Sequence, residues 1–305
     1  MSLLLGRPRA IHMSDCSAQT PTDCDFPENP ARTVPQNVNL TGKPSSYRSH
    51  LFNYALGFCI HDMLSQNINK RNVDDYGKVW KLHAAVEQLL DNLPPALRLQ
   101  NPDTTWDADH IHIARQRQKI KLHANLVLIA LHRQHAEIHL RSREAAVRAA
   151  IDALEALQVL FESLEVHQYR IYGLSCVSID ACVFLCFALQ HFALPDMQQT
   201  QRLLRCFEDT RTRLEKLKSY SQIAETGLIL LERTVQRLPS LGHISTPREI
   251  ANTALPELES GAVIDNQLQS DLDLFDFGQN GTFNIDAFED YIWASADDSL
   301  FDLNL

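Results

Sequence analysis

The sequence has no basic residue after Arg248. Residues 249–305 carry thirteen acidic side chains and a formal charge of −13, whereas residues 1–248 carry a net charge of +3. Large apolar side chains alternate with these carboxylates, an alternation typical of disordered transcriptional activation segments. Like charges keep such a chain open, so its apolar side chains stay available to a partner. We therefore expect a linker over 241–260 and a disordered acidic–aromatic tail over 261–305. The side chains of this tail that we expect to carry transcriptional activation are Leu272, Leu274, Phe275, Phe277, Trp293, Leu300, Phe301 and Leu303.

Other absences narrow the class of protein. There is no Cys-x-x-Cys pair, and the seven cysteines are odd in number, so we expect reduced thiols rather than a disulfide framework. No apolar stretch reaches 18 residues, and the longest run, 181–189, predicts a buried helix rather than a membrane span. The near-neutral body and acidic tail offer no basic face for strong binding to nucleic acid. No Walker loop, dinucleotide fingerprint or Gly-x-Ser-x-Gly motif is present, so nothing proposes an enzyme.

The chain has only ten glycines, and its body shows no strand-like alternation bounded by hairpin signals. Its apolar residues recur instead at intervals of three and four, which is the period of a helix. The sequence therefore predicts an all-α fold, an irregular bundle of about seven helices over 46–240. Residues 1–45, which contain six prolines, predict an irregular lead-in.

Individual helices can be placed from their stripes and stop signals. One begins near Tyr47, and a second begins near Asp74 and stops before Pro94. A third begins at Asp107 or Asp109 and runs to about residue 140, and Ser142 is the expected N-cap of the fourth. Residues 174–193 are apolar on nearly all sides and predict the central helix of the core. The expected buried faces of the first and fourth helices are Leu51, Ala55, Phe58, Cys59 and Met63, and Val147, Ile151, Leu154, Leu157, Phe161 and Leu164.

A group of histidines suggests a metal site. His135 and His139 lie one helical turn apart, with His132 and Glu137 nearby. A zinc protease needs the order His-Glu-x-x-His, but the order here is His-Ala-Glu-Ile-His, which puts the carboxylate on the wrong face. Cys182 and Cys186 are also one turn apart, in the most apolar helix, where thiols behave as small hydrophobic groups. We therefore expect no catalytic, cofactor-binding or metal-binding residue in this chain.

Two stretches resemble the fungal-specific transcription factor domain, the middle homology region of fungal binuclear zinc-cluster regulators. The first is Ser-Leu-Leu-Leu-Gly-Arg-Pro-Arg-Ala-Ile-His over 2–12, which contains Gly6, Arg7 and Pro8. The second is the helix over 120–133 that ends in Leu-His132-Arg133, where Gln134 replaces the usual proline. The resemblance covers roughly residues 2–240 and implies that His132 and Arg133 are structural.

The resemblance also implies the parts of such a regulator. These are an N-terminal zinc cluster that binds DNA, a helical regulatory region and an acidic activating segment. The first stretch begins at residue 2, although it lies well inside the family domain, so we expect the chain to be N-terminally truncated. Zinc and DNA contact are then expected only through the missing module. The expected location is the nucleus, and the expected partners are a transcriptional coactivator at the tail and a second copy or a full-length relative at the body.

Two alternatives stay open beside a regulator fragment. The chain could be a stand-alone cofactor that binds a full-length relative through its helical region. It could also be an α-helical biosynthetic enzyme with His132, His135 and Glu137 at its site. The tail argues against the enzyme, because an enzyme has little use for eleven large apolar side chains in an acidic extension.

Overall fold

The computed structural model describes residues 19–25, 43–71, 73–192 and 197–236. These residues form an all-α bundle of seven α-helices without a strand, which confirms the predicted fold class. Three short 3-10 helices, η3, η4 and η5, lie in the connections at Pro95–Leu97, Arg133–His135 and Val166–Gln168. The α-helices are α2 Arg48–Ser65, α3 Gly77–Asp91, α4 Ile111–His132, α5 Leu140–Glu162, α6 Tyr172–His191, α7 Met197–Leu217 and α8 Gln222–Gln236.

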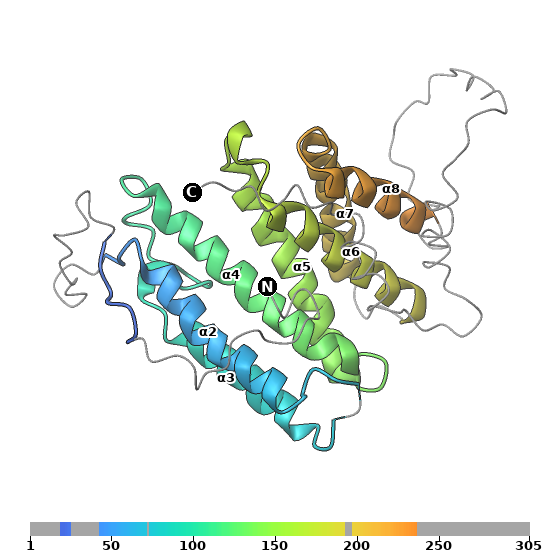
Figure 1. The fold of residues 1–305 in the computed structure, drawn as a ribbon, viewed down its shortest axis with the longest axis horizontal. Coiled ribbons are helices and arrows are strands. Elements are labelled where there is room, and N and C mark those ends of the chain that lie inside the picture. Colours follow the sequence, from blue (N-terminus) through green and yellow to red (C-terminus); the bar gives the residue numbers. More distant parts are fainter. Residues whose placement is uncertain (1–18, 26–42, 72, 193–196, 237–305) are drawn as a thin grey trace.

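Two groups of helices meet along α4 and α5. These two long helices pack against each other most extensively, with α2 and α3 against α4, and α6 and α7 against α5. Figure 1 shows α2 and α3 on one side of this pair and α6, α7 and α8 on the other. Helix α5 is therefore the element that joins the two groups, whereas α6, the expected central helix, packs between α5, α7 and α8.

The apolar seam of α5 is buried as its spacing predicts. Val147, Ile151, Leu154 and Leu157 are each at most 3% exposed. The three- and four-residue intervals keep these side chains on one face, which α4 and α6 cover. Only Leu164 differs, because it lies beyond the end of α5 and is partly buried.

Helix α6 forms the most apolar part of the core. By length and hydropathy it is the one helix of the described chain that could cross a membrane, but 72% of its most apolar window is buried inside the bundle. Its one charged side chain, Asp180, accepts a hydrogen bond from Arg133 at 3.0 Å. These contacts agree with the prediction of a core helix.

A buried arginine joins three helices of the second group. Arg213 of α7 is 1% exposed, and it donates hydrogen bonds to Gln158 of α5, Ser178 of α6 and Thr210 of its own helix. Burial lowers the pKa of its guanidinium to about 10. Because this pKa is still well above 7, the side chain stays protonated at neutral pH, and its hydrogen bonds fix the register of α5, α6 and α7.

Two predictions about individual helices are wrong, and a third, the buried face of α2, is right only at Cys59 and Met63. The third helix ends at His132 rather than near residue 140, because η4 follows it directly. Ser142 is not an N-cap: α5 begins two residues earlier, with His139 at the cap, and the Ser142 hydroxyl bonds to other helices. In α2 the buried face contains Phe52 and Leu56, while Phe58 is 42% exposed.

Residues 19–25 of the lead-in are described, and they bind the start of α2. Asp23 accepts a hydrogen bond from Arg48 at 2.8 Å, and Asp25 accepts one from the backbone N–H of Ser46 at 2.7 Å. Partial burial opposes ionisation of Asp25, but the Ser46 and Lys43 contacts together hold its pKa below the usual value. Carboxylates at a helix N-terminus stabilise it through the helix dipole, so this segment anchors α2.

Candidate functional site

Most of the predicted functional residues lie outside the described part of the chain. This holds for Gly6, Arg7 and Pro8, and for all eight side chains of the predicted activation tail. His132 and Arg133 are described. His132 is the last residue of α4 and is fully buried, and Arg133 joins η4 to Asp180 of α6.

The histidines that suggested a metal site point to different partners. His135 Nε2 bonds to the backbone oxygen of Ile68 at 2.8 Å, and His139 stacks on the Tyr76 ring with centroids 3.6 Å apart. Glu137 pairs with Arg71. Among the described residues, no group of three or more His, Cys, Asp or Glu side chains could hold a metal ion.

The paired thiols of α6 lie in the core. Cys182 and Cys186 are at most 1% exposed. Burial raises the pKa of Cys182 to about 11 and that of Cys186 well above its usual value. Metal binding and nucleophilic attack both require the thiolate, so these two side chains act as packing groups.

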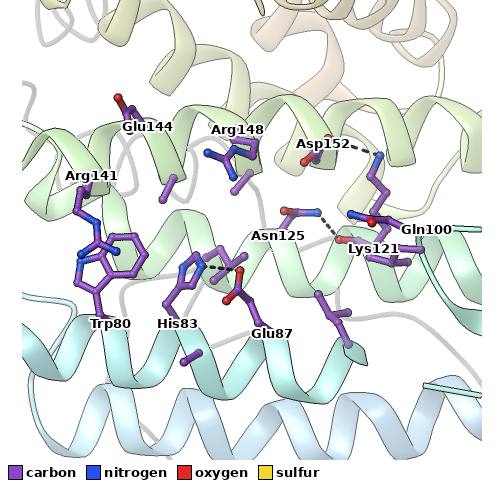
Figure 2. A pocket seen from close by; sticks show the side chains of 16 residues that line it. Trp80, His83, Glu87, Gln100, Lys121, Asn125, Arg141, Glu144, Arg148 and Asp152 are labelled. Carbon is purple, nitrogen blue, oxygen red and sulfur yellow. Dashed lines mark hydrogen bonds and ion pairs between the residues drawn. The ribbon is translucent and has the colours of Figure 1, made fainter. Parts of the chain in front are cut away.

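The structure instead places a cleft of about 710 Å³ between α3, α4 and α5. Figure 2 shows α3 as one wall, with Trp80, His83 and Glu87, and α5 as the other, with Arg141 and Arg148. Helix α4 lies between them. The volume of the cleft falls in the range of small-molecule sites, which are typically 300–1,000 Å³.

A chain of hydrogen bonds runs from the rim of this cleft into the bundle. Glu87 and His83 of α3 are joined at 3.1 Å, and His83 Nδ1 lies 2.8 Å from His132 Nε2. His132 Nδ1 lies 2.9 Å from the Ser142 hydroxyl, which lies 2.8 Å from the Tyr76 hydroxyl. Five side chains therefore tie α3, the end of α4 and the start of α5 together.

The partners fix the direction of these bonds when Glu87 is ionised and both imidazoles are neutral. The carboxylate only accepts, so His83 Nε2 carries the proton and His83 Nδ1 accepts. His132 then donates through Nε2 and accepts the Ser142 proton at Nδ1. The Ser142 oxygen accepts from the Tyr76 hydroxyl. Every polar atom in the chain is satisfied with one tautomer of each ring.

Burial keeps His132 neutral. Loss of hydration lowers its pKa to about 3, and the neighbouring His83 and His135 add to this effect. Both His132 and Ser142 are fully buried. The pair resembles the base and hydroxyl of a hydrolase, but no substrate can reach the Ser142 oxygen in this arrangement. We therefore assign the hydrogen-bond chain a structural role.

Stacked side chains extend the hydrogen-bond chain along the wall of the cleft. The Trp80 ring lies 4.8 Å from His83 and 5.1 Å from His132, measured between centroids. The Arg141 guanidinium lies 4.0 Å above the Trp80 ring. This cation–π contact brings a positive charge from α5 over α3 and closes one end of the cleft.

The other end of the cleft is closed by ion pairs. Lys121 of α4 lies 3.6 Å from both Asp152 and Glu155 of α5, and Arg202 of α7 lies 2.8 Å from the same two carboxylates. Partial burial opposes ionisation of Glu155, but the contacts with Arg202 and Lys121 lower its pKa overall. Two cations and two carboxylates balance here, so this end carries no excess charge.

No family model, curated protein or solved structure matches the chain. The resemblance to the fungal regulatory domain stays a prediction.

Sequence reasoning missed the cleft and most of the residues that form it. Trp80, His83 and Glu87 recur at intervals of three and four, which places them on one face of α3. That spacing was the available signal. Nothing in the spacing indicated that this face of α3 lies opposite Arg141 and Arg148 of α5.

Proposed function

We propose that this protein is a transcription regulator. The helical body over 46–240 is its regulatory part, and residues 261–305 form its activating segment. The observation that carries the proposal is the separation of charge along the sequence, with thirteen acidic and no basic residues after Arg248 and large apolar side chains among them. The proposed site of action is the nucleus, and the proposed partner of the tail is a coactivator with a basic, grooved surface.

Carboxylates and aromatic rings have separate roles in this proposal. The carboxylates keep the segment open and attract a basic surface over a distance. The rings supply the binding free energy, since each large apolar side chain that docks in a groove contributes about 1.5–3 kcal/mol. Ordering the segment on binding subtracts about 2–5 kcal/mol, so several rings must dock together.

DNA contact is not assigned to these 305 residues. They contain no Cys-x-x-Cys pair, and their formal net charge is −10. Specific DNA-binding proteins rely on phosphate contacts and on an element that reads a groove. The proposal therefore places DNA binding in a module or partner outside this sequence.

A reporter assay tests the proposal. The full chain is fused to a heterologous DNA-binding domain, and transcription is compared with that from the DNA-binding domain alone. We expect activation, and we expect it to fall to background when Phe275, Phe277, Trp293 and Phe301 are all changed to Ala. Losing even two of these docked rings would weaken the binding free energy by about 3–6 kcal/mol, which is more than a hundredfold in affinity.

A charge-conserving variant is the matched control. Asp→Glu changes at Asp271, Asp273 and Asp276 keep the charge and the rings, so activation should stay near the original level. An inert fusion, or an aromatic variant that still activates, would show that the tail only aids solubility.

The enzyme alternative gains no support from the cleft. The hydroxyl of Ser142 and the imidazole of His132 are enclosed by three helices, and His135 and Glu137 are engaged elsewhere. A binding role suits the cleft better, because its accessible side chains are stacked or charged rather than paired as base and nucleophile.

A further inference from the structure

Hydrogen-bond donors without acceptors gather around the cleft. The indole Nε1 of Trp80 is buried and has no hydrogen-bond partner among the described residues. Arg141 contacts the Trp80 ring through its guanidinium face but has no hydrogen-bond acceptor in the described part of the chain, and Arg148 has none there either. Buried donors in folded proteins are nearly always satisfied, so the indole N–H indicates a missing acceptor. Arg141 and Arg148 are exposed, and a bound anion would replace the water around their guanidinium groups.

The carboxylates of the cleft do not supply that acceptor. Glu87 accepts from His83, and Asp152 accepts from Arg202 and pairs with Lys121. Glu144 is the remaining carboxylate, and Figure 2 shows it directed away from the space between α3 and α5. The lining holds three cations and three carboxylates, but Arg141 and Arg148 are paired with none of these carboxylates.

The two arginines also have a useful spacing. Arg141 and Arg148 are seven residues apart on α5, so they lie on one face at a separation of about 10 Å along the helix axis. Ala145 and Ala149 line the cleft from the same helix, and Leu90 and Leu128 line it from α3 and α4. Small and apolar side chains thus leave room for an apolar group next to the cationic donors.

We propose that this cleft binds a small organic acid, with its carboxylate held by Arg148 and Arg141 and its apolar body against Ala145, Leu90 and Leu128. The carboxylate supplies the acceptors that the arginines lack, and the apolar body covers surface that is otherwise exposed to water. Inorganic phosphate would satisfy the donors but leave this apolar surface uncovered. The inference does not depend on a role in transcription, because it concerns the helical body alone.

Calorimetric titration of the full chain tests this inference. Phenylacetate is the probe, because it joins one carboxylate to one apolar ring. We expect saturable binding with a Kd below about 1 mM. Phenylacetamide has the same shape without the charge and should bind at least about tenfold more weakly, as should inorganic phosphate.

Variants locate the site. Arg148→Gln and Arg141→Gln should each weaken phenylacetate binding about tenfold or more, since each removes charged hydrogen bonds to the carboxylate. Arg148 is exposed and makes no hydrogen bond or ion pair with another described residue, so its change should leave the fold intact. Arg170→Gln is the matched control, because Arg170 is an exposed arginine in the loop after η5, outside the cleft, and it should bind phenylacetate like the original protein.

Three results would overturn the inference. The first is the absence of binding heat when the phenylacetate concentration is raised to several times the expected Kd of about 1 mM. The second is equal binding of phenylacetamide or of phosphate, which would indicate an apolar patch or a simple anion site. The third is undiminished binding in both cleft variants. Activation by the tail is measured separately, so failure of this titration leaves the reporter result unaffected.

Discussion

Buried neutral His132 should make the protein sensitive to mild acid. Its pKa is about 3 in the folded protein, against about 6.5 for an unfolded chain. Below pH 6.5 the unfolded chain therefore binds a proton that the folded protein does not bind. The free energy of unfolding must then fall as the pH falls, and the loss from this residue continues down to about pH 3.

The size of the loss follows from the two pKa values. At pH 7 protonation of the unfolded chain at this residue costs much less than about 1 kcal/mol of stability, because the unfolded imidazole is then mostly neutral. At pH 5 it costs about 2 kcal/mol, because the unfolded imidazole is then mostly charged while the folded one is still neutral. A change of about 2 kcal/mol is a large part of the 5–15 kcal/mol that stabilises a typical domain.

The test compares His132→Asn with the original protein. The asparagine oxygen can accept the Ser142 hydrogen bond, but the side chain does not titrate. Urea unfolding followed by circular dichroism at pH 7 and pH 5 gives the free energy of unfolding at each pH. We expect the variant to be less stable at pH 7 and to lose about 2 kcal/mol less than the original protein between the two values.

A second variant separates titration from simple damage. Ser142→Ala also breaks the hydrogen-bond chain, and leaving Tyr76 and His132 unsatisfied should cost about 1–3 kcal/mol. It keeps the imidazole, however, so its loss between pH 7 and pH 5 should match that of the original protein. Equal pH dependence in His132→Asn and the original protein would refute the reasoning, because His132 would then have the same pKa in the folded and the unfolded protein.

Three further expectations concern packing. Gly227→Ala should destabilise α8 by about 1–3 kcal/mol in urea unfolding, because an added Cβ would lie 2.1 Å from Ile179 Cδ1; an unchanged midpoint would contradict the α6–α8 contact. Gly57→Ala should raise stability by about 0.5–1 kcal/mol, because the position is helical and nothing lies within 4 Å of the new Cβ; a loss would indicate a contact there. A thiol reagent, followed by mass spectrometry, should leave Cys182 and Cys186 of the native protein unmodified and should modify them in the unfolded protein. The reason is that both thiols are buried and have raised pKa values. Rapid reaction in the native protein would contradict the burial of α6.

The parts of the fold that sequence predicted well have one clear apolar face. Helix α5 is such a case, since Val147, Ile151 and Leu154 leave only one side that can be buried. Helix α2 shows the opposite case. Apolar residues occur on several of its faces, so spacing alone could not distinguish the buried Phe52 from the exposed Phe58.

The candidate site could not be predicted because it is made by tertiary packing. Ser142 fits the pattern of an N-cap, and only the arrival of Tyr76 and His132 at its hydroxyl gives it another role. Likewise, Arg141 appears in sequence as a solvated charge at the start of a helix. Its place above Trp80 depends on how α3 and α5 are held on α4.

The arrangement of the two groups of helices along α4 and α5 bears on how the chain folds during synthesis. The first group, α2 to α4, is continuous in sequence and leaves the ribosome before the second, α5 to α8. Its helices can pack on one another as they emerge, but the face of α4 that meets α5 stays uncovered until α5 has been made. Because α4 and α5 are neighbours in sequence, that face is exposed only briefly, and a pause in translation between them would be the moment of greatest risk of aggregation.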